Sequence, residues 1–330
     1  MSNIDFIAIG DTVTDAFITL QDARVHCDLD DENCRISMRW GDKIPYQDLA
    51  ITPGVGNSAN AAVSAARLGL STALITDIGN DQFGKEIIDV FKKESLDSTH
   101  VRVHNDIPTN YHFVLSYEAE RTILIKHQEY PYVFPTNLEP PKTLYFSSVG
   151  EGTETYHEAI ADYGEAHPDI LFAFQPGTFQ MKLGTERLAR IYARANMVFA
   201  NKEEYQRILC SKSTEVEALL NEMRALGPDI PILTDGRDGA YALTEDGIEH
   251  VPMFPDPAPP KERTGAGDAF SSTTAALVTQ GYSLKDAMER GTVNSAYVVQ
   301  KIGAQEGLLS KEKIEEYLAN APAEYQAEKL

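Results

Sequence analysis

The feature that most constrains the fold of this chain is a short run of small residues between a segment that cannot form a helix and one well suited to it. Residues 255–260 are rich in proline and exclude a helix. Residues 269–278 are small and apolar, and they predict a buried helix. Gly265, Ala266 and Gly267 stand where that helix should begin. Backbone N–H groups at a helix start lack partners and carry partial positive charge, and small residues let an anion approach them closely. The sequence therefore predicts an anion-binding helix N-terminus.

Asp268 lies one turn into the predicted helix, where its carboxylate would repel a bound anion. One interpretation gives Asp268 a chemical role beside that anion. The other is an ordinary tight turn, in which an aspartate early in the helix only favours the helix dipole. A bare Gly-x-Gly-Asp string favours the ordinary turn, so the choice between the two depends on the rest of the chain.

Short apolar runs alternate with helical segments along much of the chain. Strands are predicted at residues 4–9, 144–149, 170–174 and 196–200, and helices at residues 154–166 and 185–195. This alternation predicts a parallel sheet with right-handed crossovers. Asp15 follows the first strand, at the sheet edge where ligands of open α/β sheets bind, although it could equally be a turn residue.

Four further strands have no helices between them. They are predicted at residues 17–20, 35–40, 111–117 and 122–126. An acidic segment at residues 28–33 separates the first two, and residues 118–121 predict a hairpin turn between the last two. Such strands do not belong in a doubly wound core, so we expect a small sheet that stands off the main domain.

Three polar or glycine-containing loops follow predicted strands. Residues 53–60 form a glycine-rich loop before a small-residue helix at residues 61–68. Asn201 begins a string, Asn-Lys-Glu-Glu, that can cap a helix with acidic residues in its first turn. Residues 231–240 predict a strand, a glycine turn and the start of a hairpin.

Residues 79–85 nearly match a P-loop. Glu86, however, replaces the Ser or Thr that must hold magnesium, so we exclude a P-loop here.

Residues 262–270, Glu-Arg-Thr-Gly-Ala-Gly-Asp-Ala-Phe, resemble the C-terminal signature of the ribokinase-like (PfkB) carbohydrate kinase family. Glu262 stands where the family usually has Asp, and Arg263 where Thr is common. The loops above also resemble family motifs and follow the family's order, from about residue 4 to about residue 307. The resemblance implies one ribokinase-like kinase domain over residues 1–330. Its α/β fold would be a three-layer, doubly wound, mainly parallel sheet with a small β-sheet lid, inserted at about residues 16–52 and 107–128.

The resemblance also implies an activity, the ATP-dependent phosphorylation of a hydroxyl group of a sugar. Asp268 would be the base, and the amides of Gly265, Ala266 and Gly267 would form the anion hole. The family's acceptor-binding positions correspond to Asp15, Gly56, Asn57 and Asn60. Its nucleotide-binding positions correspond to Asn201, Thr234, Gly236, Gly239 and Asn294. Glu204 would hold Mg²⁺ through water, with MgATP as the phosphoryl donor, and a monovalent cation such as K⁺ is a further candidate.

Several alternatives stay open. The acceptor could be a nucleoside, as in an adenosine-type kinase, or less readily a sugar phosphate, for which Arg102, Arg121 and Lys126 are available. A catalytically silent binding protein of the same fold is the outside alternative, and the retained Asp268 argues against it. A Rossmann dehydrogenase is disfavoured because no Gly-x-Gly-x-x-Gly follows the first strand.

Charge and composition narrow the class of partner. A net charge of −21 is a poor match to nucleic acid or to an anionic membrane surface. The sequence has neither an apolar run near 18 residues nor a signal-peptide pattern at its start, so we expect a cytoplasmic protein. Cys27, Cys34 and Cys210 are too few and too irregularly spaced for a disulfide framework, and reduced thiols are expected. The resemblance also implies a homodimer formed through the lid.

Overall fold

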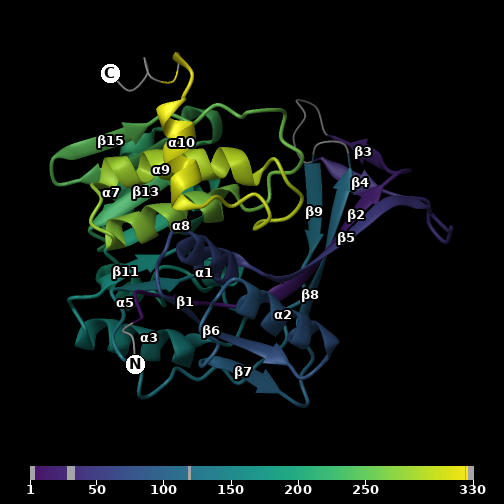
Figure 1. Ribbon diagram of the computed structural model, residues 1–330, viewed down its shortest axis with the longest axis horizontal. Coiled ribbons are helices and arrows are strands. Elements are labelled where there is room, and N and C mark those ends of the chain that lie inside the picture. The colour runs from purple at the N-terminus through teal and green to yellow at the C-terminus, as the bar shows by residue number, and fades with distance from the viewer. Residues whose placement is uncertain (1–3, 28–33, 118–119, 324, 326–330) are drawn as a thin grey trace.

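A computed structural model describes residues 4–27, 34–117, 120–323 and 325 of the chain (Figure 1). Nine strands in this described part form one large sheet. Seven of them are parallel, in the spatial order β7 (Val101–His104), β6 (Thr72–Gly79), β1 (Phe6–Ile9), β10 (Thr143–Phe146), β11 (Leu171–Phe174), β12 (Met197–Asn201) and β13 (Ile230–Thr234). The antiparallel strands β14 (Ala240–Thr244) and β15 (Gly247–Val251) complete the far edge.

Helices cover both faces of this sheet because successive strand residues point to opposite sides. In β1, Phe6 and Ala8 pack into one hydrophobic core, whereas Ile7 and Ile9 pack into the other. The first core is covered by α1 (Asn57–Arg67), α2 (Gln82–Lys93), α8 (Ala266–Thr279), α9 (Leu284–Val298) and α10 (Lys311–Ala319). The second is covered by α3 (Glu154–Ala166), α5 (Ala189–Arg194), α6 (Lys202–Leu209) and α7 (Val216–Arg224). The predicted three-layer α/β architecture is therefore confirmed.

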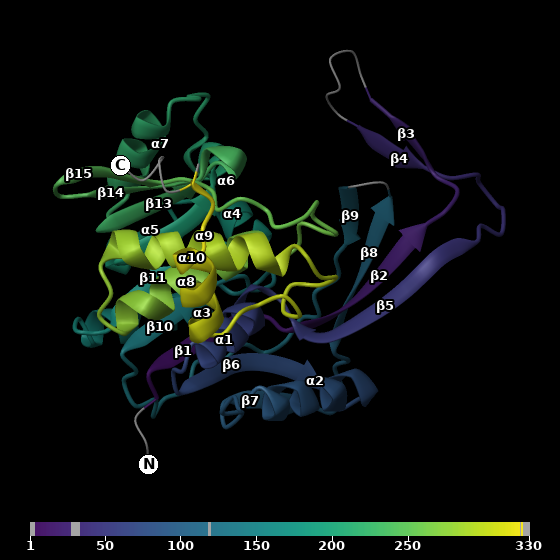
Figure 2. The ribbon, with the colours of Figure 1, turned by 45° about the horizontal axis from the view of Figure 1, so that its top comes forward.

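A second, four-stranded sheet stands off the main body (Figure 2). Its order is β5 (Tyr46–Val55), β2 (Val13–Leu20), β8 (Asn110–Tyr117) and β9 (Glu120–Leu124). The hairpin of β8 and β9 was predicted, although residues 118–119 of its turn lie outside the described residues. The strand β5 was missed, because Pro53 and Gly54 near its end are typical of a loop.

The segment predicted as a strand at residues 35–40 does not join this sheet. Its first residues form β4 (Arg35–Ser37), which pairs with β3 (Arg24–His26) in a separate two-stranded hairpin. The acidic segment at residues 28–33, between these strands, lies outside the described residues. The short helix α4 (Thr178–Leu183) was also missed, and α1 begins one turn earlier than the predicted helix at residues 61–68.

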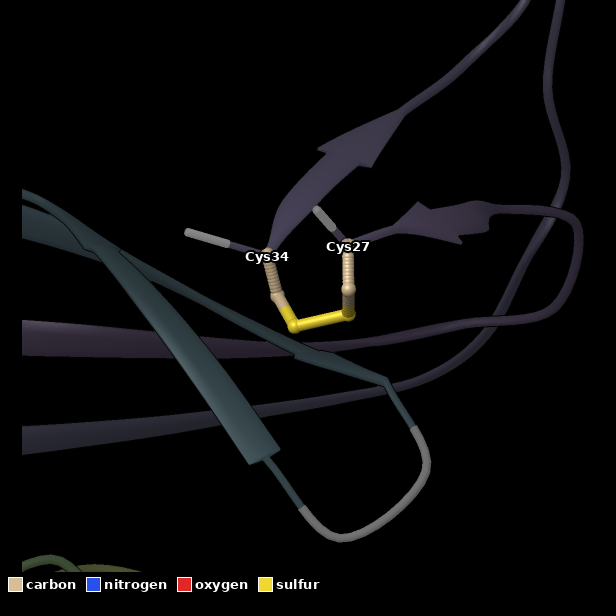
Figure 3. Close-up of a disulfide and its surroundings, with 2 residues drawn as sticks. All are labelled: Cys27 and Cys34. Carbon is tan, nitrogen blue, oxygen red and sulfur yellow. A yellow bond between two sulfur atoms is a disulfide. The ribbon is translucent and has the colours of Figure 1, made fainter. Parts of the chain in front are cut away.

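The expectation of reduced thiols is wrong for two of the three cysteines. Cys27 and Cys34 form a disulfide at the end of the β3–β4 hairpin where the connecting segment joins the two strands (Figure 3). The antiparallel register pairs His26 with Arg35, so the next residue outward on each strand is a cysteine, and their Cα atoms lie 3.9 Å apart. Sequence spacing did not reveal this because the β3–β4 pairing itself was not predicted. Cys210 is free and exposed.

Among the described residues, no helix is both long and apolar enough to cross a bilayer.

This pairing predicts the thiol count of the native protein. Alkylation in denaturant without reductant should modify one cysteine per chain, Cys210, and alkylation after reduction should modify all three. Intact-mass spectrometry measures both numbers. The Cys210→Ser variant is the control and should take up no label before reduction. Three modified cysteines without reductant would contradict the pairing.

Candidate active site

A cavity of about 430 Å³ lies at the carboxyl ends of the parallel strands. The ends of β1, β10, β11, β12 and β13, or the loops just after them, each contribute to its lining. The residues are, in the same order, Asp11, Ser148, Gln175, Asn201 and Thr234. The chain leaves β1 toward β6 on one side and returns to β10 on the other, so the cavity lies at a topological switch point, where α/β sheets bind ligands. The small sheet adds residues from β2, β8 and β9 to the wall.

Asp268, in the first turn of α8, lines the cavity and is held by three side-chain amides. Its Oδ1 accepts hydrogen bonds from Asn57 (2.8 Å) and Gln175 (2.9 Å), and its Oδ2 accepts one from Asn60 (2.7 Å). An ionised carboxylate is a pure acceptor, so three donors stabilise the charged form and fix its orientation. A residue that only favoured the helix dipole would not require these three partners.

Gln175 was not among the predicted site residues. Its amide nitrogen donates to Asp268, and its Oε1 lies 2.6 Å from the hydroxyl of Tyr145. That hydroxyl is 2.7 Å from Ser271 Oγ, one turn further along α8. The available signal was positional, because Gln175 directly follows a core strand at the edge where ligands bind.

The glycines at the start of α8 differ in what surrounds them. Gly265 is the N-cap with φ +85°, and a Cβ there would lie 2.6 Å from Ala304 Cβ. Gly265 is therefore required by the fold. A Cβ on Gly267 would meet no atom within 4 Å, although this residue lines the cavity. Packing thus explains Gly265 but leaves the space beside Gly267 open. Gly56, before α1, resembles Gly265, with φ +114° and a Cβ that would lie 2.7 Å from the Asp11 carbonyl oxygen.

Asp15, on β2, also lines the cavity and lacks a full set of partners. Its Oδ1 is buried and makes no hydrogen bond to any residue that the structure describes, and His112 Nδ1 lies 3.5 Å away. Burial, and then the charge of Glu262, raises the pKa of Asp15 to about 7. Burial, and then His127, lowers the pKa of His112 to about 4. The two groups therefore do not form a strong ion pair at neutral pH, and Asp15 retains acceptor capacity for a ligand.

Asn201 caps α6 through a reciprocal pair of hydrogen bonds with Glu204. Asn201 Oδ1 accepts from the Glu204 amide, and Glu204 Oε2 accepts from the Asn201 amide, each at 2.9 Å. Both side chains nevertheless line the cavity, and burial raises the pKa of the Glu204 carboxyl. The capping interpretation is confirmed, and it does not exclude a ligand role.

A second cavity, of about 160 Å³, adjoins the first and shares Thr234, Arg263 and Gly267 with it. Gly236 and Gly239 also line it, as do three residues on one side of α9, Thr292, Ser295 and Ala296, and the residue after this helix, Val299.

Asn294 does not line either cavity. It is fully buried, donates to Thr273 Oγ1 (2.8 Å) and accepts from the Leu309 amide (2.9 Å). Its position on α9 directs it toward α8 instead. Asn294 therefore lies between α9 and its neighbouring segments, whereas Thr292 and Ser295 of the same helix line the smaller cavity.

The three basic residues suggested for a second phosphate are separated in the structure. Arg102 forms an ion pair with Asp77 (2.7 Å), and Lys126 does not line the cavity. Arg121, on β9, does line it, and its Nε lies 3.7 Å from Glu262.

The chain matches known proteins over most of its length. Residues 34–311 match the model of the pfkB family of carbohydrate kinases. The ATP-dependent 6-phosphofructokinase of Thermoanaerobacterium thermosaccharolyticum is 26% identical over 76% of this chain and 80% of its own. The aminoimidazole riboside kinase of Salmonella typhimurium is 31% identical over 66% of this chain and 71% of its own. The crystal structure of the Methanocaldococcus jannaschii nucleoside kinase superposes with a TM-score of 0.79 at 19% identity, covering 97% of this chain and 100% of that one.

The contrast between the two glycines gives a stability prediction. Gly265→Ala should lower the free energy of unfolding by about 2–4 kcal/mol, because it adds both backbone strain and overlap with Ala304. Gly267→Ala should change it by no more than about 1 kcal/mol, since its Cβ meets open space within a helix. Urea denaturation followed by circular dichroism measures both. Equal destabilisation by the two substitutions would show that Gly267 is also there for packing.

Proposed function

Because the chain belongs to the pfkB family of carbohydrate kinases, we propose that it transfers the γ-phosphoryl group of ATP to a hydroxyl group of a sugar. The observation that carries this proposal is the placement of Asp268. Its carboxylate, fixed by three amide donors, lies at the start of α8 beside the unobstructed backbone at Gly267.

In the proposed reaction the acceptor occupies the larger cavity and the nucleotide the smaller one. The two cavities meet at Gly267, which supports transfer at that point. The acceptor oxygen forms a bond to the γ-phosphorus while the bond from that phosphorus to ADP breaks. Asp268 takes the hydroxyl proton, and the amides of Gly265, Ala266 and Gly267 stabilise the charge of the phosphoryl group. Positioning and charge stabilisation of this kind supply most of the catalysis of phosphoryl transfer.

Magnesium would be bound through water rather than by a cage of side chains. Within the described ranges no group of three or more His, Cys, Asp or Glu residues could hold a metal. Glu204 offers one carboxylate in the cavity, which fits Mg²⁺, since this ion usually keeps several waters and binds substrate phosphates. The ion would neutralise phosphate charge in a protein whose net charge is −21.

A sugar acceptor would contact Asp15, Gly56, Asn57 and Asn60. Arg121 is the observation that favours a sugar phosphate as a second candidate, since it lines the cavity. Glu262 lies beside it, however, and offsets its charge, so we favour an uncharged sugar. The names of the relatives include a phosphofructokinase, a riboside kinase and a nucleoside kinase, so a nucleoside stays the other candidate.

We also propose that the small sheet acts as a lid and joins two chains in a homodimer. One face of this sheet carries Asp15 and His112, which line the cavity. The strand register places apolar residues on the other face, and four of them are 44–52% exposed: Leu49, Ile51, Phe113 and Leu124. A continuous exposed apolar face of this kind is typical of an interface, and a second copy of the chain would cover it.

The kinase assignment is tested first by an acceptor panel. We expect ADP release with at least one of D-ribose, D-fructose, D-fructose 6-phosphate, adenosine and inosine. Asp268→Asn should lower kcat by roughly 10²–10⁴ because it cannot take the proton, while ATP affinity holds. Asp286→Asn, an exposed aspartate in the first turn of α9, is the control and should leave kcat unchanged. Near-normal turnover by Asp268→Asn would contradict its role as base.

The dimer is tested by light scattering after size exclusion. The wild type should show twice the chain mass of 36.5 kDa. Phe113→Glu should shift the protein to monomer, since it puts a charge at the centre of the apolar face. Ile248→Glu changes a similarly exposed residue on β15 of the main sheet and should leave the dimer intact. A monomeric wild type would overturn the proposal.

A further inference from the structure

A polar cluster around the buried Asp11 forms the part of the cavity wall nearest the end of β1. Asp11, whose side chain is 2% exposed, accepts a 2.5 Å hydrogen bond from His127 Nδ1. The hydroxyl of Tyr132 lies 2.8 Å and 3.0 Å from the two Asp11 oxygens and donates to this carboxylate. None of these three residues belongs to the motifs that identified the site.

The Asp11 carboxylate fixes how the imidazole of His127 is presented. A carboxylate only accepts, so Nδ1 carries a proton, and Nε2 is the ring nitrogen left for another partner. Nε2 makes no hydrogen bond within the described part of the chain, and His127 lines the cavity. The ring packs edge-on against Phe179, with 5.1 Å between centroids, and lies 5.2 Å from the ring of His112. The imidazole is therefore held in place before a ligand binds.

Two polar atoms near His127 also lack hydrogen-bond partners. His112 Nε2 and Asp15 Oδ1 are buried and make no hydrogen bond within the described residues, and both side chains line the cavity. Buried polar atoms without partners destabilise a fold, and their presence in a cavity points to a ligand that satisfies them. A molecule with several neighbouring hydroxyl groups could pair with Asp15 and with His127 at once. A hydroxyl both donates and accepts, so it suits either protonation state of Nε2.

We propose that His127 is a specificity-determining residue, which binds through Nε2 a hydroxyl group of the acceptor other than the one that is phosphorylated. Asp11 and Tyr132 are positioning residues that fix the imidazole. The inference rests on the proposed kinase function and narrows its substrate class to acceptors with at least two hydroxyl groups besides the reacting one, one for Asp15 and one for His127.

The chain contains a matched control for this cluster. His104 and Asp77 form a second, part-buried pair, with Nε2 2.6 Å from the carboxylate, and the His104 ring lies 5.1 Å from Tyr130. Neither residue lines the cavity. Replacing His104 therefore breaks the same kind of interaction without removing a cavity residue.

The experiment measures ADP release by the full chain with ATP and the five acceptors named above, and with 2-deoxy-D-ribose, 2′-deoxyadenosine and 1-, 3- and 4-deoxy-D-fructose. His127→Phe keeps the ring packing and removes the nitrogen atoms. It should raise the KM for the acceptor about tenfold or more, as expected for one lost hydrogen bond to a fixed partner, and leave the KM for ATP within about twofold. The wild type should prefer the acceptor over its deoxy analogues, and for one of these analogues the preference should be weaker in His127→Phe. Tyr132→Phe should raise the KM for the acceptor by a smaller factor.

His104→Phe should leave the KM for the acceptor unchanged. If His127→Phe fails to fold, His127→Gln, which keeps a hydrogen-bonding group, replaces it and should show the same selective effect on a smaller scale. Three outcomes would overturn the role of His127 and leave the kinase proposal standing. They are an unchanged KM for the acceptor, equal effects on the KM values for acceptor and ATP, and a preference against every deoxy analogue that is as strong as in the wild type. A wild type that phosphorylates no member of the panel would overturn the kinase proposal, and this inference with it.

Discussion

The site depends on the contact between α1 and α8. Asn57 and Asn60 reach Asp268 only because the two helices lie close together, and small side chains at their interface, such as Ser64 and Thr273, allow this approach. Gln175 adds a third donor from the end of β11. The Asp268 carboxylate thus connects α1, from the first third of the chain, with the end of the central strand β11 and with α8, which begins at Ala266. A shift of any of these elements would misplace it.

Local features of the sequence predicted much of the fold. The small-residue run before Asp268 does begin a buried helix, and α3 has the predicted bounds. The capping string at Asn201 also forms as expected. These signals succeed because helix starts, caps and buried strands depend on neighbouring residues. The kinase family was identified for a related reason, since its motifs are short, ordered strings.

Features that require distant pairing were not predicted. The bond between Cys27 and Cys34 depends on strand register, and the role of Gln175 depends on a residue 93 positions away. The resemblance placed Asn294 at the nucleotide, whereas rotation along α9 turns it toward α8 and brings Ser295 to the cavity. The cluster of Asp11, His127 and Tyr132 was missed because His127 and Tyr132 lie 116 and 121 positions after Asp11 in the sequence.

The path of the chain from β1 into β2 has a mechanical consequence. The chain forms a central strand of the main sheet up to Ile9 and a strand of the small sheet from Val13 onward, so residues 10–12 are the joint between the two sheets. Rotation of the small sheet about this joint would carry Asp15 and His112 with it, while Asp268 stayed with the main body. Such a rotation would change the distance between Asp15, which we propose contacts the acceptor, and Asp268, which we propose takes its proton. A molecule too small to touch both, such as water, would leave the joint relaxed, which would protect ATP from wasteful hydrolysis.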